Sequence, residues 1–175
     1  NVVVYISPKS FLELCDRFLE IGMSIGKKEE AQMIVTKVKA EAYEIKKETE
    51  ILPKTRIFIQ MGADPLYTVT KNSFIHSFID FAGGENIAYD AETGQYSREE
   101  VLRRNPDVII IVTMGIVGDE EKKIWQKYET INAAKNNRIY IIDSYKVCSP
   151  TPITFIETLK EFVEILYPEE VVNVE

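Results

Sequence analysis

Short apolar runs alternate with segments of helical periodicity along most of this chain. The segments typical of buried strands are residues 2–6, 56–61, 86–89, 107–113 and 138–143. The segments typical of helices are residues 10–21, 27–52, 73–82, 97–105, 119–134 and 152–167. Strands and helices in alternation predict βα units in series, and therefore an α/β fold with right-handed crossovers.

The segment 27–52 stands out by its length. Its apolar residues form one stripe, with Lys and Glu on the opposite face, and Pro53 ends the pattern; the stripe comprises Ala31, Ile34, Val35, Val38, Ala42 and Ile45. About 24 residues at a rise of about 1.5 Å each give a helix roughly 36 Å long, which is long for a globular domain.

The strongest strand signal is Val108 to Val112, a run that is apolar at every position. Such a run predicts a central parallel strand with helices on both faces. The expected fold is a Rossmann-like lobe with a mainly parallel sheet flanked by helices. Ligands of such sheets bind beyond the carboxyl ends of the strands, which here are residues 61–64, 89–90, 113–115 and 143–145.

The composition of the chain limits the classes of function that are compatible with it. The net charge of −7 argues against nucleic-acid binding, which depends on clustered Lys and Arg. No apolar run approaches the roughly 18 residues of a membrane span, and the chain opens on a strand pattern without a leader, as a mature secreted protein also would.

The search for catalytic motifs is negative. The sequence contains no phosphate-binding loop, dinucleotide fingerprint, nucleophile elbow or zinc-protease motif. His76 is the single histidine and lies within a helix pattern, so it favours a structural role. We expect no metal site, no cofactor and no enzymatic activity, and we expect Cys15 and Cys148 to be unpaired thiols.

Several phrases in order resemble one family. The most specific are Phe81-Ala-Gly-Gly-Glu-Asn-Ile-Ala88 and Asn105-Pro-Asp-Val-Ile-Ile110, accompanied by Phe58–Val69, Tyr96–Leu102 and Ala134–Asp143. In this spacing they are similar to the substrate-binding proteins of ABC importers for vitamin B12, haem and ferric siderophores. The resemblance extends to about Pro168.

The resemblance implies two α/β lobes joined by one long helix. Residues 1–26 would be the remnant of an N-terminal lobe, 27–52 the interlobe helix, 53–168 the C-terminal lobe and 169–175 a tail. About a hundred further residues would precede this point in the family, within the size range of a domain. With its neighbours missing, the apolar strand Val2 to Ile6 is expected to self-associate.

The resemblance also implies the function: capture of a metal chelate or corrinoid outside the cytoplasm and its delivery to a membrane permease. The expected ligand contacts lie at strand ends, namely Asp64, Pro65, Leu66, Tyr67, Tyr96, Met114 and Tyr145. Cobalamin-binding members carry a tryptophan shortly before the docking glutamate, and Glu92 to Gln95 contains none, which weakens the B12 hypothesis.

The docking glutamate of the family corresponds to Glu99, at the start of a helix. A carboxylate suits docking onto permease arginines, although Glu99 could equally serve only to support that helix N-terminus. Two alternatives remain open: an α/β enzyme using the strand ends, and a structural or sensing module built on the same lobe.

Overall fold

The computed structural model describes residues 6–113 and 118–168 of the chain. In that part a single sheet has the strand order β2-β1-β4-β5, with β3 also paired to β1. The strands are β1 (Arg56–Ala63), β2 (Leu66–Thr68), β3 (Glu85–Asn86), β4 (Val108–Val112) and β5 (Ile139–Ile142). Only the β1–β2 pairing is antiparallel, so the predicted α/β fold with a mainly parallel sheet is confirmed.

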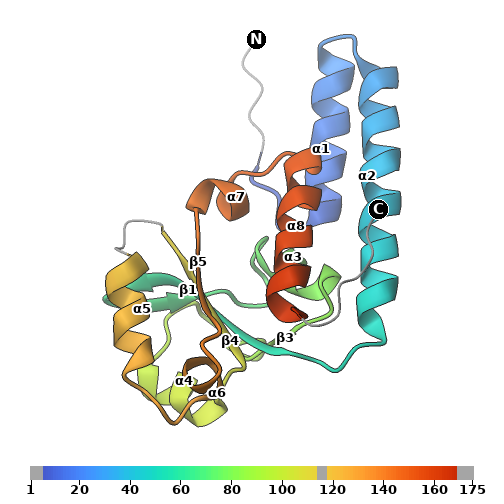
Figure 1. Ribbon diagram of the computed structural model, residues 1–175. Coiled ribbons are helices and arrows are strands. Elements are labelled where there is room, and N and C mark those ends of the chain that lie inside the picture. Colours follow the sequence, from blue (N-terminus) through green and yellow to red (C-terminus); the bar gives the residue numbers. More distant parts are fainter. Residues whose placement is uncertain (1–5, 114–117, 169–175) are drawn as a thin grey trace.

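Strand β4 lies between β1 and β5, and all five of its side chains are buried. Alternate side chains of a strand point to opposite faces, so a run apolar at every position requires cover on both. On one face Ile110 packs in a cluster with residues of α1, α2, α3 and α8; on the other Ile109 packs with α4, α5 and α6 (Figure 1).

The predicted long helix is α2 (Lys28–Glu50), which runs antiparallel beside α1 (Phe11–Ser24) (Figure 1). Its predicted stripe faces α1 and α8, where the apolar side chains are buried. The Ser10 hydroxyl caps α1 by accepting a hydrogen bond from the Glu13 N–H. Gly22 lies inside α1, where an added Cβ would overlap Ala31 of α2, so the two helices approach closely at this point.

Helix α8 (Pro152–Leu166) begins at Thr151, whose side chain accepts from the Thr154 N–H. It packs aromatic rings against the rest of the helical layer: Phe155 stacks on Phe11 at 4.2 Å and on Phe78 at 4.4 Å between ring centroids. These buried rings fix α1, α3 (His76–Phe81) and α8 to one another.

Three predicted elements are shorter than expected. The helix predicted at 73–82 begins only at His76, after a turn closed by the Ser73 N–H to Thr70 carbonyl bond. The strand predicted at 86–89 pairs only at Glu85–Asn86. The helix predicted at 119–134 is divided into α5 (Gly118–Gln126) and α6 (Asn132–Lys135), because Ile131 between them is drawn into the core.

Two elements were not predicted. Strand β2 follows directly on β1, and helix α7 (Ser144–Cys148) follows β5 with Asp143 accepting from the Tyr145 N–H. Helix α4 (Arg98–Arg104) begins after Ser97 as predicted, with the Ser97 hydroxyl accepting from the Glu100 N–H.

Three sequence predictions lie outside the described residues: the strand from Val2, the ligand contact Met114 and the tail 169–175. Ile6, the described end of that strand segment, is irregular and exposed. Self-association through this strand therefore stays a prediction.

Candidate functional site

A hollow of about 300 Å³ lies at the carboxyl end of β1, where the fold class predicts a ligand. We call it the strand-end hollow. Its lining combines hydroxyl, amide and apolar groups; the residues are Met61, Tyr67, Thr68, Val69, Thr70, Asn72, Ser73, Ile75 and Gly94.

The hairpin of β1 and β2 shapes this hollow. The Thr68 N–H donates to the Gly94 carbonyl at 2.7 Å, which fastens the 94–96 segment alongside β2. Tyr67 is 48% exposed, and its ring lies directly over Gly94, where an added Cβ would overlap the ring. Glycine at position 94 therefore decides where the Tyr67 ring can lie.

A second hollow of about 370 Å³, the α7 hollow, adjoins the first at Ser73 and Ile75. It lies between the end of α7, the start of α1 and the 73–75 turn; the lining residues are Ser7, Pro8, Leu14, Ser73, Phe74, Ile75, Val147, Cys148, Ser149 and Pro150. No described lining residue of either hollow is Asp, Glu, Lys, Arg or His. We call the two hollows together the uncharged face.

The four predicted ligand contacts at the β1–β2 turn do not all face the strand-end hollow. Asp64 and Pro65 are exposed at the turn, and Tyr67 lines the strand-end hollow. Leu66 points the opposite way and is buried with Phe58 in the core, because neighbouring residues of a strand face opposite sides.

The other predicted contacts are not brought together. Tyr96 packs its ring on Phe58 at 5.9 Å between centroids and lines neither hollow. Tyr145 is 82% exposed on α7, beside the residues that line the α7 hollow.

Sequence reasoning missed the segment from Thr68 to Ile75, which lines both hollows. A cluster of Thr, Asn and Ser immediately after a strand end was a usable signal, but β2 had not been predicted. Without that hairpin, nothing in the sequence placed Thr70 and Asn72 beside Met61.

The second region of interest is where α4 meets α5. The Glu121 carboxylate, nearly buried, accepts from Arg98 and from Gln60, both at 2.7 Å. Trp125 Nε1–H donates to Gln60 Oε1 at 2.6 Å, and the Arg98 guanidinium lies 4.7 Å from the Trp125 ring centroid. The network fixes the start of α4 to α5 and to β1.

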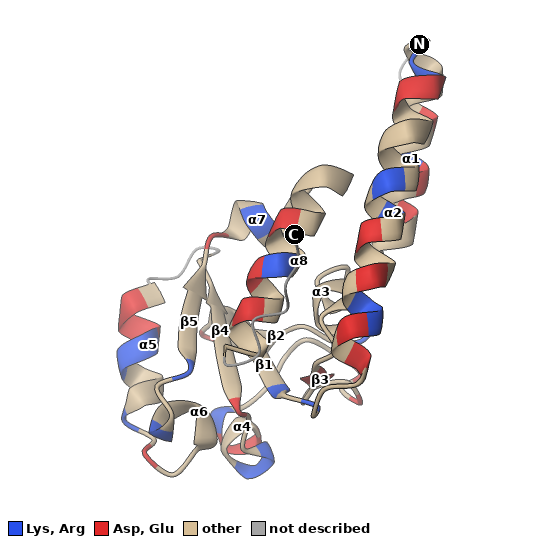
Figure 2. Ribbon diagram, turned by 45° about the vertical axis from the view of Figure 1, so that its right-hand side comes forward, with Lys and Arg blue, Asp and Glu red and all other residues tan. Residues whose placement is uncertain are grey.

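Glu99, the predicted docking residue, is exposed beside this network on α4, where acidic and basic side chains gather (Figure 2). Within the described residues no hydrogen bond or ion pair is found for its carboxylate, whereas Arg98 is tied to Glu121. Glu100 binds Arg103 and Arg104, and these hydrogen bonds lower the pKa of Glu100 to about 2. Of the two glutamates in this turn, Glu99 is thus the one without a partner among the described residues.

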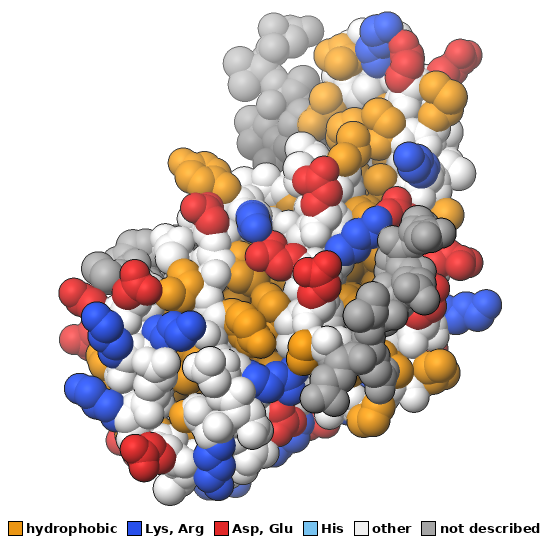
Figure 3. All heavy atoms as spheres, in the orientation of Figure 1, with side chains coloured by type: hydrophobic (Ala, Val, Ile, Leu, Met, Phe, Trp, Pro, Cys, Tyr) orange, Lys and Arg blue, Asp and Glu red, His pale blue; other side chains and the backbone are white. Residues whose placement is uncertain are grey.

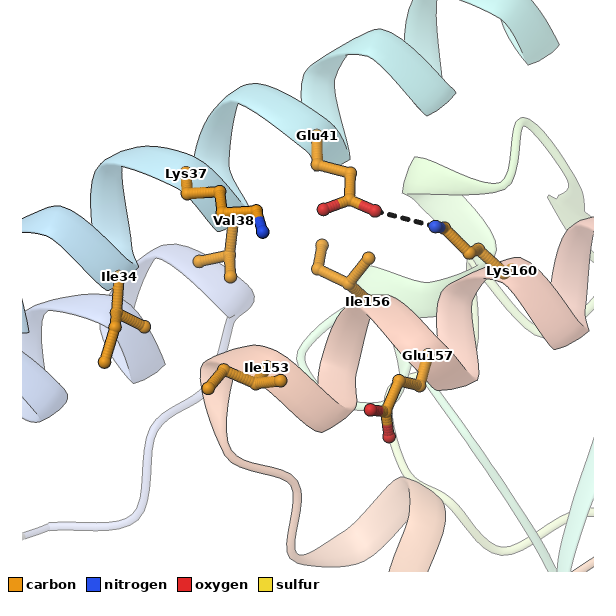
Figure 4. A pocket seen from close by; sticks show the side chains of 8 residues that line it. All are labelled: Ile34, Lys37, Val38, Glu41, Ile153, Ile156, Glu157 and Lys160. Atoms are coloured by element: carbon orange, nitrogen blue, oxygen red, sulfur yellow. Dashed lines mark ion pairs between the residues drawn. The ribbon is translucent and has the colours of Figure 1, made fainter. Parts of the chain in front are cut away.

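Two further hollows in the described part of the molecule are lined by charged side chains. A groove of about 320 Å³ between α2 and α8 has an apolar floor including Val38 and Ile156, and a rim bridged by the 2.7 Å Glu41–Lys160 ion pair (Figure 4). Another hollow, of about 330 Å³ near α3, is lined by Lys46 and His76 among others. Burial lowers the pKa of His76, so it stays neutral near pH 7.

Within residues 6–113 and 118–168 no cluster of three or more His, Cys, Asp or Glu side chains is placed to hold a metal. In the same part of the chain, no helix combines the length and hydrophobicity needed to cross a bilayer. Figure 3 shows charged side chains of both signs interspersed over one face of the molecule, with apolar side chains gathered over the upper part of the α1–α2 pair. Exposed apolar residues of these two helices include Met23 and Met33.

An α/β lobe with a long flanking helix and an uncharged concave face at its strand ends has the architecture in which ligand-binding sites commonly occur. The chain belongs to the periplasmic binding protein family, whose sequence profile matches residues 1–146. The family resemblance noted from the sequence is thereby confirmed.

The named relatives of this chain support the family assignment. A vitamin B12-binding protein of Salmonella paratyphi A is 32% identical over 111 residues, covering 62% of this chain and 42% of the relative. Another, from Pectobacterium atrosepticum, is 37% identical over 78 residues, or 43% of this chain and 28% of the relative. The chain thus spans less than half the length of these curated relatives.

Among solved structures, a possible iron-binding periplasmic solute-binding protein from Staphylococcus epidermidis superposes with a TM-score of 0.81 at 27% identity. The match covers 94% of this chain and 66% of that one.

Proposed function

We propose that this chain is the ligand-binding part of an ABC importer's substrate-binding protein, and that a metal chelate or corrinoid lies against the uncharged face. The uncharged face carries the proposal: a concave surface at the carboxyl ends of the strands, with the aromatic ring of Tyr67 presented beside hydroxyl and amide groups. Relatives named for vitamin B12 and iron support the chelate class. The protein would act outside the cytoplasm and without catalysis.

Tyr67 is the residue whose ring we expect to contact the ligand. It is half-exposed, held over Gly94, and flat enough to pack on a macrocycle or on the ligands of a bound metal. Asp64, Pro65 and Tyr145 flank the face and remain proposed contacts at its edge. The proposal does not rest on Leu66 or Tyr96, which pack in the core.

The test is calorimetric titration of this chain with cyanocobalamin, haemin and a ferric trihydroxamate. We expect saturable binding of at least one, weakened about tenfold by Tyr67→Ala. Tyr43→Ala is the matched control, because Tyr43 is 50% exposed on α2 and lines neither hollow of the uncharged face. No saturable binding of any of the three, or equal effects of the two substitutions, would contradict the proposal.

For delivery, we propose that Glu99 pairs with a basic side chain of the membrane permease. Its carboxylate is exposed, and the Arg98–Glu121 pair fixes the turn that carries it. An exposed acidic group mainly accelerates and orients encounter with a basic partner.

Permease docking is tested by stimulation of the cognate transporter's ATPase activity at low salt. Glu99→Lys is expected to abolish most of the stimulation, and Glu129→Lys, the same charge change at another exposed position, to preserve it. Equal stimulation by the two variants would remove Glu99 from the docking surface.

A further inference from the structure

The described lining of the uncharged face lacks the charged side chains that are frequent in the rest of the chain. Asp, Glu, Lys and Arg make up 28% of the chain, yet none of them lines the described part of either hollow. The undescribed segments 1–5 and 114–117 also contain no such residue and no histidine.

Nearby cations are turned away from the face. Lys71 lies between Thr70 and Asn72, yet its ammonium group lies 5.4 Å from the Tyr89 ring centroid, outside the strand-end hollow. Lys146 directly precedes four lining residues of the α7 hollow, but it pairs with Glu161 at 2.7 Å. Their charges are therefore directed to other partners.

The titratable group on the α7 hollow is also neutral. Burial raises the pKa of the Cys148 thiol above its ordinary value, so this side chain carries no charge at neutral pH. The lining of the face offers a ligand apolar surface, hydroxyl groups and the Asn72 amide. The charged group at its edge, Asp64, is an exposed carboxylate and would repel an anion.

On a surface without charged side chains, the charge of a ligand strongly affects its free energy of binding. Removing an anion from water costs several kcal/mol unless a charged or strongly hydrogen-bonding partner replaces the water. Proteins that bind multiply charged anions supply Arg or Lys for this purpose. A neutral chelate loses little hydration and gains from apolar and hydroxyl contacts.

We propose that this site selects electrically neutral metal complexes and discriminates against anionic ones. This rests on the proposed function, because it concerns the same face. Three singly charged hydroxamates neutralise ferric iron, whereas three doubly charged catecholates leave a triply negative complex. The preferred ligand class is therefore a neutral trihydroxamate-type chelate or a neutral corrinoid.

The experiment compares ferrichrome, a neutral ferric trihydroxamate, and cyanocobalamin with ferric enterobactin, an anionic ferric tricatecholate, by calorimetry at one ionic strength. At least one neutral complex is expected to bind about tenfold or more tightly than the tricatecholate. Tighter or equal binding of the tricatecholate overturns the charge selectivity and leaves the proposed function standing. With haemin added to the series, saturable binding of haemin alone, whose propionates are anionic, also overturns the charge selectivity. Saturable binding of none of the four complexes overturns both proposals.

A charge insertion gives a second readout. Asn72 is exposed and lines the strand-end hollow, so Asn72→Lys places one cation on the face. We expect it to raise tricatecholate affinity about threefold or more at low salt and to leave the binding of the neutral complexes nearly unchanged. The control is Asn136→Lys, at an exposed position outside both hollows. Equal effects of the two lysines would show that net charge, and not the face, sets the preference.

Discussion

The uncharged face and the α4–α5 end of the molecule are both built on β1, yet they differ in how they handle charge. At the face, β1 ends among Thr, Asn, Ser and apolar groups. A short distance along the same strand, Gln60 joins Arg98 and Glu121 in a nearly buried charged network. One strand thus separates a surface suited to an uncharged ligand from a surface that holds ions in fixed positions.

The difference shows what each region is suited to do. A neutral surface is suited to a ligand that arrives and leaves without exchanging ionic partners. A region with fixed ion pairs holds the exposed Glu99 at a defined place on α4, where the proposed docking would depend on charge and orientation. The following substitutions separate the two regions.

The largest expected effect is on the charged network. Glu121→Ala removes the carboxylate that accepts from both Arg98 and Gln60 and leaves the partly buried Arg98 guanidinium without its anion. We expect a loss of about 3 kcal/mol in the free energy of unfolding. Urea denaturation followed by Trp125 fluorescence measures it, since Trp125 is the one tryptophan of the chain and lies in the network.

Glu120→Ala is the matched control for that substitution. Glu120 is exposed in the same helix turn, and its loss should change stability by less than about 1 kcal/mol. Similar losses for the two variants would mean that the network contributes no more than an ordinary surface carboxylate.

An intermediate effect is expected at the uncharged face. Gly94→Ala forces the Tyr67 ring off its present position, because the added methyl group would occupy the ring's place. Ligand affinity should fall about tenfold, while the unfolding free energy changes little because Tyr67 is half-exposed and can rotate outward. A Gly94→Ala variant with unchanged affinity would separate Tyr67 from the ligand.

The smallest expected effect is the change of stability with pH that comes from the ion pairs of Glu100 with Arg103 and Arg104 on α4. The hydrogen bonds from Arg103 and Arg104 lower the pKa of Glu100 from 4.5 to about 2. A carboxylate with a lowered pKa in the folded state stabilises it fully above the unfolded value and loses that contribution as pH falls toward 2. Because the cluster is exposed, the contribution is small and screened by salt.

Glu100→Gln should therefore reduce stability slightly at pH 7, and the difference from the unsubstituted chain should vanish near pH 2. Thermal unfolding across this range at low salt measures the difference. A difference that persists unchanged at pH 2 would show that Glu100 stabilises α4 by something other than its charge.

The sequence was most informative where one physical requirement dominated. Val108 to Val112 had to be a central strand because no half-exposed strand is apolar throughout, and the α2 stripe had to face a partner. The cap at Ser97 followed from local chemistry alone.

The ligand surface was only partly predictable, because it depends on how distant segments meet. The strand-end rule pointed to Met61 and Tyr67, and both line the strand-end hollow. It could not show that Leu66 turns inward, since that depends on the short β2 pairing. Nor could it show that Ser73 and Ile75 join two hollows, because Val147 and Ser7 come from opposite ends of the chain.

Under the proposed function, the ligand binds at the uncharged face and not in the groove between α2 and α8. Amide chemical-shift mapping of the labelled chain during titration with the ligand that binds most tightly locates the site directly. We expect the largest shifts at Met61, at 67–75 and at 147–149. Largest shifts at Ile34 to Glu41 and Ile153 to Lys160 would place the ligand in the groove of Figure 4 and contradict the account.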